Sequence, residues 1–353
     1  MENTAYSNEP KVDLQEWLKV KRKGISDEAK YVKRFYGLEC GILVRTSYLS
    51  HEEWLEARKL GITGTDLGGL TGISKYSTPI KVYLDKTGEL EPIEDNEAMY
   101  WGRVMEDVIA KEFQSRNTVK INKVNAILKH PDNEWALGNI DRLITNEAGE
   151  KGILEIKTVS EYIKTSWDGE EVPPQYMVQI QWYMYVTGAT YGYFAALIGG
   201  NKYVQKYVER DEELINMLID IAKDFWENNV IKRVPPLVDG SEASTGLLNS
   251  LYPQSESCTE IQLPEEAIEL IEKRTELKAK SKELDIEIAE CENKLKDHLK
   301  DNEVGIINDF KVTWKSQSRT SIDTKKLKAE EPELFKKYSK TSSYRKFDIN
   351  RRI

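Results

Sequence analysis

The sequence predicts an α/β (α+β) fold with a central mixed sheet flanked by helices, on three observations. Apolar residues recur at helical spacing over residues 97–115, which predicts a long amphipathic helix. Residues 119–159 contain runs rich in β-branched residues separated by polar turns, which predict a meander of strands. A helical segment over residues 174–187 and two further strands over 191–209 follow. This order of helices and strands is typical of a core with a mixed sheet.

The length and the composition predict one large domain and a smaller one. A chain of 353 residues can bury a sizeable core. We expect a polar leader over residues 1–47, a core domain over 48–232 and a linker over 233–262 that contains Pro235-Pro236 and a Ser/Glu/Gly-rich run. Residues 263–353 are predicted to form a long helix followed by a small basic α+β extension.

The composition argues against several classes of protein. No apolar run approaches the roughly 18 to 20 residues of a membrane span, and the N-terminus lacks a basic region followed by an apolar one, so we expect a cytoplasmic protein with no membrane partner. The three cysteines, Cys40, Cys258 and Cys291, form no Cys-x-x-Cys pair, which argues against a disulfide framework and against a zinc or iron–sulfur site. Because the chain has only three histidines, carboxylates and lysines must carry any catalysis.

Charge is distributed unevenly along the chain. The net charge is −9, yet residues 311–353 contain 13 Lys or Arg against 5 Asp or Glu, a net charge of +8 that leaves −17 for the rest. Aromatic residues are interleaved with these basic ones, which suits nucleic acid, although a solvated small domain would show the same pattern. The overall acidity does not exclude DNA, because a cleft can be locally positive.

A helix is predicted to begin after Ser50, because Glu53 stands where a capping box requires an acidic residue. It contains Arg58 and ends at Gly61. Residues 62–69 are rich in glycine and threonine and are predicted to form a loop that leads into another short helix, so backbone amides, threonine hydroxyls and the arginine could form a phosphate pocket. An ordinary connection between two helices would explain the same glycines.

Two further helices are predicted over residues 79–86, with a proline in the first turn, and over 97–115. In the longer helix Glu106 shares an apolar stripe with Ile109 and Phe113, which predicts a buried or cleft-facing carboxylate. Such a carboxylate is costly unless it is paired or bound to a metal. The alternative is a glutamate at the rim of an exposed helix.

The strands of the meander carry the clearest candidate site. Strands are predicted over residues 119–129, 134–145 and 152–159. Glu155 and Lys157 project to the same side of their strand, and pairing of the last two strands would bring Asp141 to that side. Two carboxylates and a main-chain carbonyl suit Mg²⁺, and a lysine whose pKa is lowered could then activate a water. A solvent-facing hairpin of alternating charge is the alternative.

The remaining elements complete the core and the C-terminal part. The helix over 174–187 places Tyr176 and Gln179 about one turn apart on one face. Strands over 191–198 and 202–209, a helix over 211–229, a long helix over 265–300 and a hairpin with an Asn-Asp turn over 305–314 follow. The long helix has heptad spacing that Arg274 and Ser281 interrupt, which favours a helical hairpin partner or a packing arm over a strict coiled coil.

Residues 50–230 together resemble the phage recombination exonucleases, the lambda-exonuclease or YqaJ type of the PD-(D/E)xK nuclease superfamily. The resemblance rests on several motifs in the family's order, namely Trp54 with Arg58, Gly61, Thr63, Thr65 and Asp66; Trp101-Gly102 with Glu106; Asp141 with Glu155-Ile156-Lys157; and Tyr176 with Gln179-x-Gln181. Two positions depart from the pattern: Thr65 replaces the usual serine but keeps its hydroxyl, and Asn139 stands where a serine often precedes the catalytic aspartate.

The resemblance implies a PD-(D/E)xK restriction-endonuclease-like core over 48–232 and a role for each residue. The implied metal ligands, for Mg²⁺ with Mn²⁺ as a substitute and two ions per site, are Glu106, Asp141, Glu155 and the carbonyl of Ile156. The implied catalytic group also includes Lys157, which would activate the water, and Gln179, which would hold it or the lysine. The implied phosphate and DNA contacts are Arg58, Thr65, Asn139 and Tyr176.

The resemblance therefore implies a Mg²⁺-dependent 5′→3′ exonuclease that degrades linear double-stranded DNA from its ends for single-strand annealing recombination. It further implies a phage or prophage gene in a bacterial host, a RecT-like annealing protein as partner and a homotrimeric ring. A related endonuclease or helicase-coupled nuclease is one alternative. A non-catalytic DNA-binding or partner-docking protein, acting through residues 263–353, is another.

Overall fold

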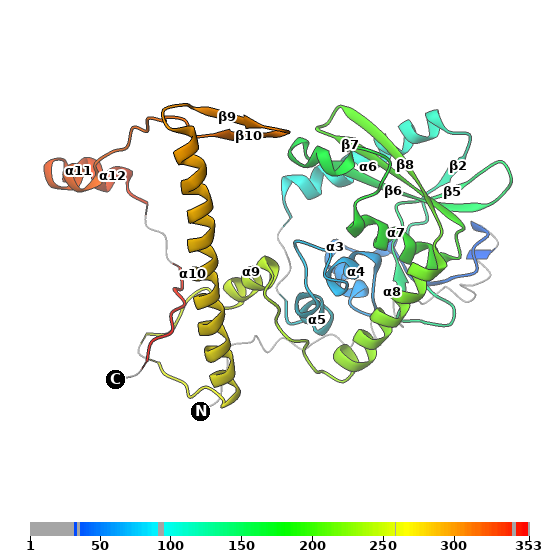
Figure 1. The fold of residues 1–353 in the computed structure, drawn as a ribbon. Coiled ribbons are helices and arrows are strands. Elements are labelled where there is room, and N and C mark those ends of the chain that lie inside the picture. The colour runs from blue at the N-terminus through cyan, green and yellow to red at the C-terminus, as the bar shows by residue number, and fades with distance from the viewer. Residues whose placement is uncertain (1–31, 34–35, 91–94, 258, 341–343, 352–353) are drawn as a thin grey trace. The chain divides into compact units, whose positions relative to one another are not determined.

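The computed structural model describes residues 32–33, 36–90, 95–257, 259–340 and 344–351. It divides into two units, Met1–Leu248 and Asn249–Ile353, which are described separately below (Figure 1). Most of the predicted leader lies outside the described residues. Its last part does not: Gly41–Arg45 forms strand β1 of the first unit, so the leader prediction is wrong at its C-terminal end.

A five-stranded mixed sheet forms the centre of the first unit, in the order β2-β5-β6-β7-β8. Its strands are β2 (Lys120–Asn122), β5 (Arg142–Thr145), β6 (Lys151–Val159), β7 (Tyr191–Ile198) and β8 (Lys202–Glu209). Strands β6 and β7 run parallel, joined through a helix, whereas the other neighbours run antiparallel. The prediction of a central mixed sheet flanked by helices is confirmed.

Alternate residues of β6 face helices on opposite sides of the sheet (Figure 1). Leu154 and Ile156 pack in one apolar cluster with Phe113 of α6 (Glu97–Arg116). The side chain of Glu155 points the other way, to α7 (Pro174–Thr187), where Gln179 contacts it. Each polar residue of β6 is therefore placed relative to α6 and α7 by strand alternation alone.

A second, three-stranded sheet supports the segment before α4. It contains β1, β3 (Ala126–Lys129) and β4 (Leu137–Gly138), and helix α3 (His51–Arg58) packs on it through Ala57. The predicted strands 119–129 and 134–145 are thus each divided between two sheets. In the first, the backbone turns at Asn125, whose φ is +49°.

The remaining helices of the first unit are α4 (Gly64–Leu70), α5 (Pro79–Thr87) and α8 (Glu212–Asp224), which continues into a π-helical segment, Phe225–Ile231. Two expectations change. Most of the predicted small-residue loop, 62–69, is helix α4, which begins at Gly64 with Thr63 as its N-cap. The helix predicted over 211–229 ends at Asp224 as an α-helix, because the backbone widens into the π segment.

Helix α7 is fixed by hydrogen bonds as well as by packing. The indole of Trp182, fully buried, donates to the carbonyl of Leu137 at 3.0 Å. The amide of Gln181 donates to the carbonyl of Glu209 at 2.7 Å and accepts from the N–H of Asp211 at 3.0 Å. These bonds fix α7 against β4 on one side and against the junction of β8 and α8 on the other.

The second unit consists mainly of exposed elements. Its long helix α10 (Glu266–Leu299) is followed by the hairpin of β9 (Val304–Ile307) and β10 (Phe310–Thr313), then by α11 (Thr324–Glu330) and α12 (Pro332–Tyr338).

Helix α9 (Glu242–Leu251) lies in the segment predicted to be a linker, with Ser244 and Leu247 buried. Among the described helices, none combines the length and the apolarity that a membrane span requires.

The double hydrogen bond of Gln181 makes a stability prediction. Gln181→Leu keeps the side-chain volume but leaves the carbonyl of Glu209 and the N–H of Asp211 without their partners, so we expect it to lower the free energy of unfolding by about 2 kcal/mol. Urea unfolding measures this change. Gln205→Leu, which removes exposed hydrogen bonds to Asn117, is the matched control and should cost less than about 0.5 kcal/mol. Equal losses in the two variants would contradict the prediction.

Candidate functional site

The site lies where the pairing of β5 and β6 ends. The last register pair is Arg142 with Leu154, and β6 continues beyond it through residues 155–159. Asp141 comes just before β5, and its Oδ2 accepts a hydrogen bond from the N–H of Ile156 at 2.8 Å. The carboxylate of Asp141 thus accepts the hydrogen bond that a backbone carbonyl of β5 would accept if the pairing continued. This bond fixes Asp141 beside β6.

Glu155 is the most buried group of the site, with 1% of the residue exposed. Its Oε2 accepts hydrogen bonds from Nζ of Lys157 and from Nε2 of Gln179, both at 3.0 Å. The same Nε2 lies 3.4 Å from the hydroxyl of Tyr183, one turn further along α7. The other carboxylate oxygen, Oε1, is buried and has no hydrogen-bond partner. Oε1 of Glu155 can therefore still accept a hydrogen bond or bind a cation.

Burial and like charge shift the pKa values of these groups. Burial raises the pKa of Glu155 to about 8, and Asp141 adds to the shift. Burial also raises the pKa of Asp141, against the opposing effect of Lys157. For Lys157, burial disfavours the charged form, but the carboxylates outweigh it and raise the pKa of the ammonium. The surroundings therefore favour the charged form of Lys157, and the lowered pKa that would suit a general base is not found in this arrangement.

The donor set fits a divalent cation. Two neighbouring carboxylates with raised pKa values and an unpartnered buried oxygen are stabilised when positive charge is placed between them. In a strand, the N–H and C=O of one residue point to the same edge, so the carbonyl of Ile156 faces the side of Asp141. Asp141, Glu155 and this carbonyl would hold the ion.

Glu106 lies near this set but outside it. Arg142, almost fully buried, is ion-paired with Glu106 and with Asp107 of α6, and Lys123 lies 3.1 Å from Glu106. Nη1 of Arg142 also donates to the carbonyl of Asp141 at 2.6 Å, so this ion-pair cluster adjoins Asp141, while the side chain of Glu155 faces α7. In the described part of the chain no three acidic, histidine or cysteine side chains converge as a metal cluster. Glu106 is nevertheless close enough to Asp141 for its negative charge to help raise the pKa of that carboxyl, and its role as a ligand stays a prediction.

A second group of polar side chains surrounds Arg58 at the end of α3. Its Nη2 donates to the hydroxyls of Thr63 at 3.2 Å and of Thr65 at 2.5 Å, and its guanidinium lies 4.6 Å from the ring centroid of Trp54. Thr65 is exposed, whereas Nε of Arg58 is buried without a partner. The structure brings Arg58 and Thr65 together, and their predicted contact with a phosphate stays a prediction.

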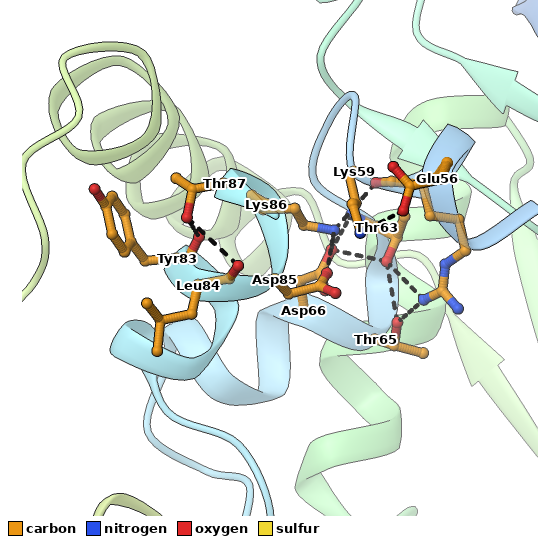
Figure 2. Close-up of polar contacts among 11 residues, drawn as sticks. Glu56, Lys59, Thr63, Thr65, Asp66, Tyr83, Leu84, Asp85, Lys86 and Thr87 are labelled. Carbon is orange, nitrogen blue, oxygen red and sulfur yellow. Dashed lines mark hydrogen bonds and ion pairs between the residues drawn. The ribbon is translucent and has the colours of Figure 1, made fainter. Parts of the chain in front are cut away.

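Asp66 and Lys86 hold this group in place, as Figure 2 shows. Asp66 accepts from the N–H of Thr63 at 2.7 Å and pairs with Nζ of Lys86 at 2.7 Å. Burial opposes ionisation of Asp66, but Lys86 and Arg58 outweigh it and lower its pKa. Nζ of Lys86 also donates to the carbonyl of Arg58 at 3.1 Å. Because Asp66 takes the N–H of Thr63, that amide is not available to a phosphate.

The two groups meet across a close contact between α4 and α7. A Cβ on Gly64 would lie 2.7 Å from the ring of Tyr183 and 2.9 Å from the carbonyl of Gln179, so only glycine allows this approach. Burial is the main cause that raises the pKa of the Tyr183 hydroxyl. The charge of Glu155 raises this pKa further, and the charge of Arg58 lowers it. Tyr183 therefore lies between the carboxylate group and the arginine group.

Other predicted residues lie at the margins. The ring centroid of Tyr176 is 5.4 Å from Nζ of Lys157, so this tyrosine adjoins the lysine, and its predicted contact with DNA stays a prediction. Oδ1 of Asn139 lies 3.5 Å from the indole nitrogen of Trp54, beside the arginine group. Sequence reasoning missed Arg142 and Tyr183. Tyr183 could have been found from its spacing, because it stands one turn after Gln179 on α7.

Comparisons with known proteins show the family of the chain. A family model described as the YqaJ-like viral recombinase domain matches residues 53–190, which include both groups of side chains. The Bacillus subtilis (strain 168) protein YqaJ is 40% identical over 311 residues, covering 87% of this chain and 97% of that protein. The chain belongs to the YqaJ family. The family resemblance that the motifs indicated is thereby confirmed.

Solved structures show more distant likenesses to this YqaJ-family chain. The alkaline exonuclease LHK-Exo from Laribacter hongkongensis has a TM-score of 0.44 at 18% identity, covering 57% of this chain and 100% of that one. A phage-related exonuclease from Haemophilus somnus 129PT has a TM-score of 0.36 at 14% identity, covering 49% and 96%.

The raised pKa of Glu155 makes a prediction about pH. The folded carboxyl titrates at about 8 and a free one at 4.5, so between these values the folded state binds more protons and loses stability as pH rises. In EDTA, we expect Glu155→Gln to weaken this decline and to raise the unfolding temperature at about pH 8 by roughly 5 °C. Thermal unfolding across this range measures it, with the exposed Glu147→Gln as control. Parallel pH profiles for Glu155→Gln and the wild type would refute the assignment.

Proposed function

We propose that this protein is a Mg²⁺-dependent nuclease that digests linear double-stranded DNA from its ends in the 5′→3′ direction. The observation that carries the proposal is the open, buried oxygen of Glu155, next to Asp141 and within a network that includes Lys157 and Gln179. A divalent ion held there supplies Lewis-acid stabilisation of the charge that develops on the scissile phosphate. Mn²⁺ is expected to substitute, because it accepts the same oxygen ligands.

Each residue of the carboxylate group has a distinct task in phosphodiester hydrolysis. Lys157 is a cation in this arrangement, so it orients the attacking water and offsets negative charge. Gln179 holds the carboxylate of Glu155 in one orientation, and Tyr183 contacts the amide of Gln179. Burial on α7 excludes bulk water from Gln179, which strengthens these electrostatic contacts.

Direction of digestion would come from the arginine group. Arg58 and the exposed hydroxyl of Thr65 form a donor pair suited to a terminal phosphate. Because α4 contacts α7 at Gly64, an anchored 5′ phosphate would place the neighbouring linkage near Glu155. Anchoring of one end gives the enzyme its polarity and a preference for ends over closed circles.

Loss of the lysine tests the catalytic proposal. In Mg²⁺, we expect Lys157→Ala to slow digestion of a linear duplex by at least about a hundredfold, while EDTA abolishes digestion by the wild type. Release of nucleotides from an end-labelled duplex measures the rate. Lys151→Ala is the matched control, because this lysine lies at the other end of β6, where its Nζ donates to Thr145. Full activity of Lys157→Ala, or no product from the wild type with any divalent metal, would overturn the proposal.

The arginine group is tested with the state of the DNA end. We expect Arg58→Ala to slow digestion of a 5′-phosphorylated duplex by about tenfold to a hundredfold, and to change digestion of a 5′-hydroxyl duplex little. Paired rate measurements on the two duplexes give the ratio. Lys59→Ala, which removes a neighbouring cation paired with Glu56, should keep the preference for the phosphate. Efficient cutting of closed circular DNA would instead favour an endonuclease.

The wider setting extends the same proposal. The match to the YqaJ-like viral recombinase domain supports a role in phage recombination. In this role, a RecT-like protein would anneal the strand that digestion exposes. We include that partner and a homotrimeric ring in the proposal. Co-purification with the annealing protein and the mass of the native assembly in solution test the two parts separately.

A further inference from the structure

We infer that the second unit carries a binding surface for single-stranded DNA, formed by the described residues of 311–353, here called the basic segment. The inference goes beyond the catalytic site, and only its biological setting rests on the proposed function. Its rings are exposed: the exposed fractions are 51% for Trp314, 74% for Tyr338, 81% for Tyr344 and 76% for Phe347.

These rings do not serve as a core. In the described residues of the second unit, Leu299 is the only buried hydrophobic residue, and it lies at the end of α10. Exposed aromatic rings are unfavourable in water unless a partner covers them. The rings therefore offer flat apolar faces to a ligand from outside the unit.

Cations lie beside the rings. The Nζ of Lys337 is 5.5 Å from the ring centroid of Tyr338, and the guanidinium of Arg274 is 5.5 Å from that of Phe347. Within the described part of the segment, Lys326 and Lys346 are the only basic residues in ion pairs. Arg345 donates to the carbonyl of Tyr252 at 3.4 Å, and the other cations are exposed. The described residues of the segment contain 12 Lys or Arg against 5 Asp or Glu, a net charge of +7.

This combination distinguishes single-stranded nucleic acid from other anionic partners. Phosphates of a strand take the cations, and unpaired bases stack on the rings. A duplex offers the same phosphates but hides its base faces, and an acidic protein surface offers no ring-sized stacking partner. Digestion of one strand of a duplex leaves the other single, so the basic segment would hold the product strand.

The test uses the full-length protein in EDTA, where no digestion occurs. The probe is a fluorescein-labelled 30-nucleotide oligothymidylate, and its anisotropy gives the dissociation constant. We expect the triple variant Tyr338→Ala, Tyr344→Ala and Phe347→Ala to weaken binding by at least tenfold, since each stacked ring contributes about fivefold or more. Tyr252→Ala, an exposed ring of the same unit outside the segment, is the control.

The charges are tested in the same assay. Lys336→Glu with Lys337→Glu should weaken binding and reduce the slope of log affinity against log salt by about 1.4, because two phosphate contacts are lost. Lys278→Glu with Lys282→Glu on the exposed face of α10 is the charge-matched control.

The outcomes separate the possible ligands. Loss of oligothymidylate binding in the ring variant, with binding of a 30-base-pair duplex unchanged, supports the inference. If the ring variant binds as the wild type does while only the lysine changes matter, and heparin competes equally with both, the segment is a general polyanion surface and the inference is overturned. Because digestion is absent from the assay, either the binding surface or the nuclease can fail alone.

Discussion

The hydrogen bond from the N–H of Ile156 to Asp141 is the interaction on which the site depends. It exists because β5 stops pairing at Arg142 while β6 continues, so a backbone donor needs a side-chain acceptor. The same bond holds the carboxylate of Asp141 next to Glu155. This arrangement is unfavourable for two charged groups, as the raised pKa values of both show. An unfavourable pair of acidic groups persists here because the fold fixes them before any ligand arrives, which is typical of functional sites.

Strand alternation then divides the surrounding residues into two sets. On the side of β6 that faces α6, Leu154 and Ile156 pack in the apolar core, and the opposite side carries Glu155 and Lys157. Arg142 belongs to the α6 side and neutralises Glu106 there, so this glutamate does not add to the repulsion at Glu155. Asp141 lies between the two sets, because its carbonyl accepts from Arg142 and its carboxylate accepts from the N–H of Ile156.

Local sequence patterns predicted the elements that depend on local periodicity. The strands β7 and β8 and helix α7 have the predicted bounds, because alternation or helical spacing runs through each without interruption. The predicted strands 119–129 and 134–145 were wrong as single elements. The first is divided because β2 pairs with β5 whereas β3 pairs with β1, and both partners are distant in the sequence. The contacts of Arg142 with Glu106, and of Lys86 with Arg58, cross about 30 residues of sequence, and no local pattern records them.

The polar groups on α3 and β6 form one site only because two helices approach closely. Gly64 allows α4 to lie against Gln179 and Tyr183, and any larger residue would collide with the tyrosine ring or the helix carbonyl. Asp66, two residues further, pairs with Lys86 and thereby ties the same turn to α5. A substitution at Gly64 would leave every charged group in the sequence intact and still separate Arg58 from Glu155. The spacing between anchor and carboxylates is thus a property of backbone packing, which explains why small residues accompany the charged ones in this motif.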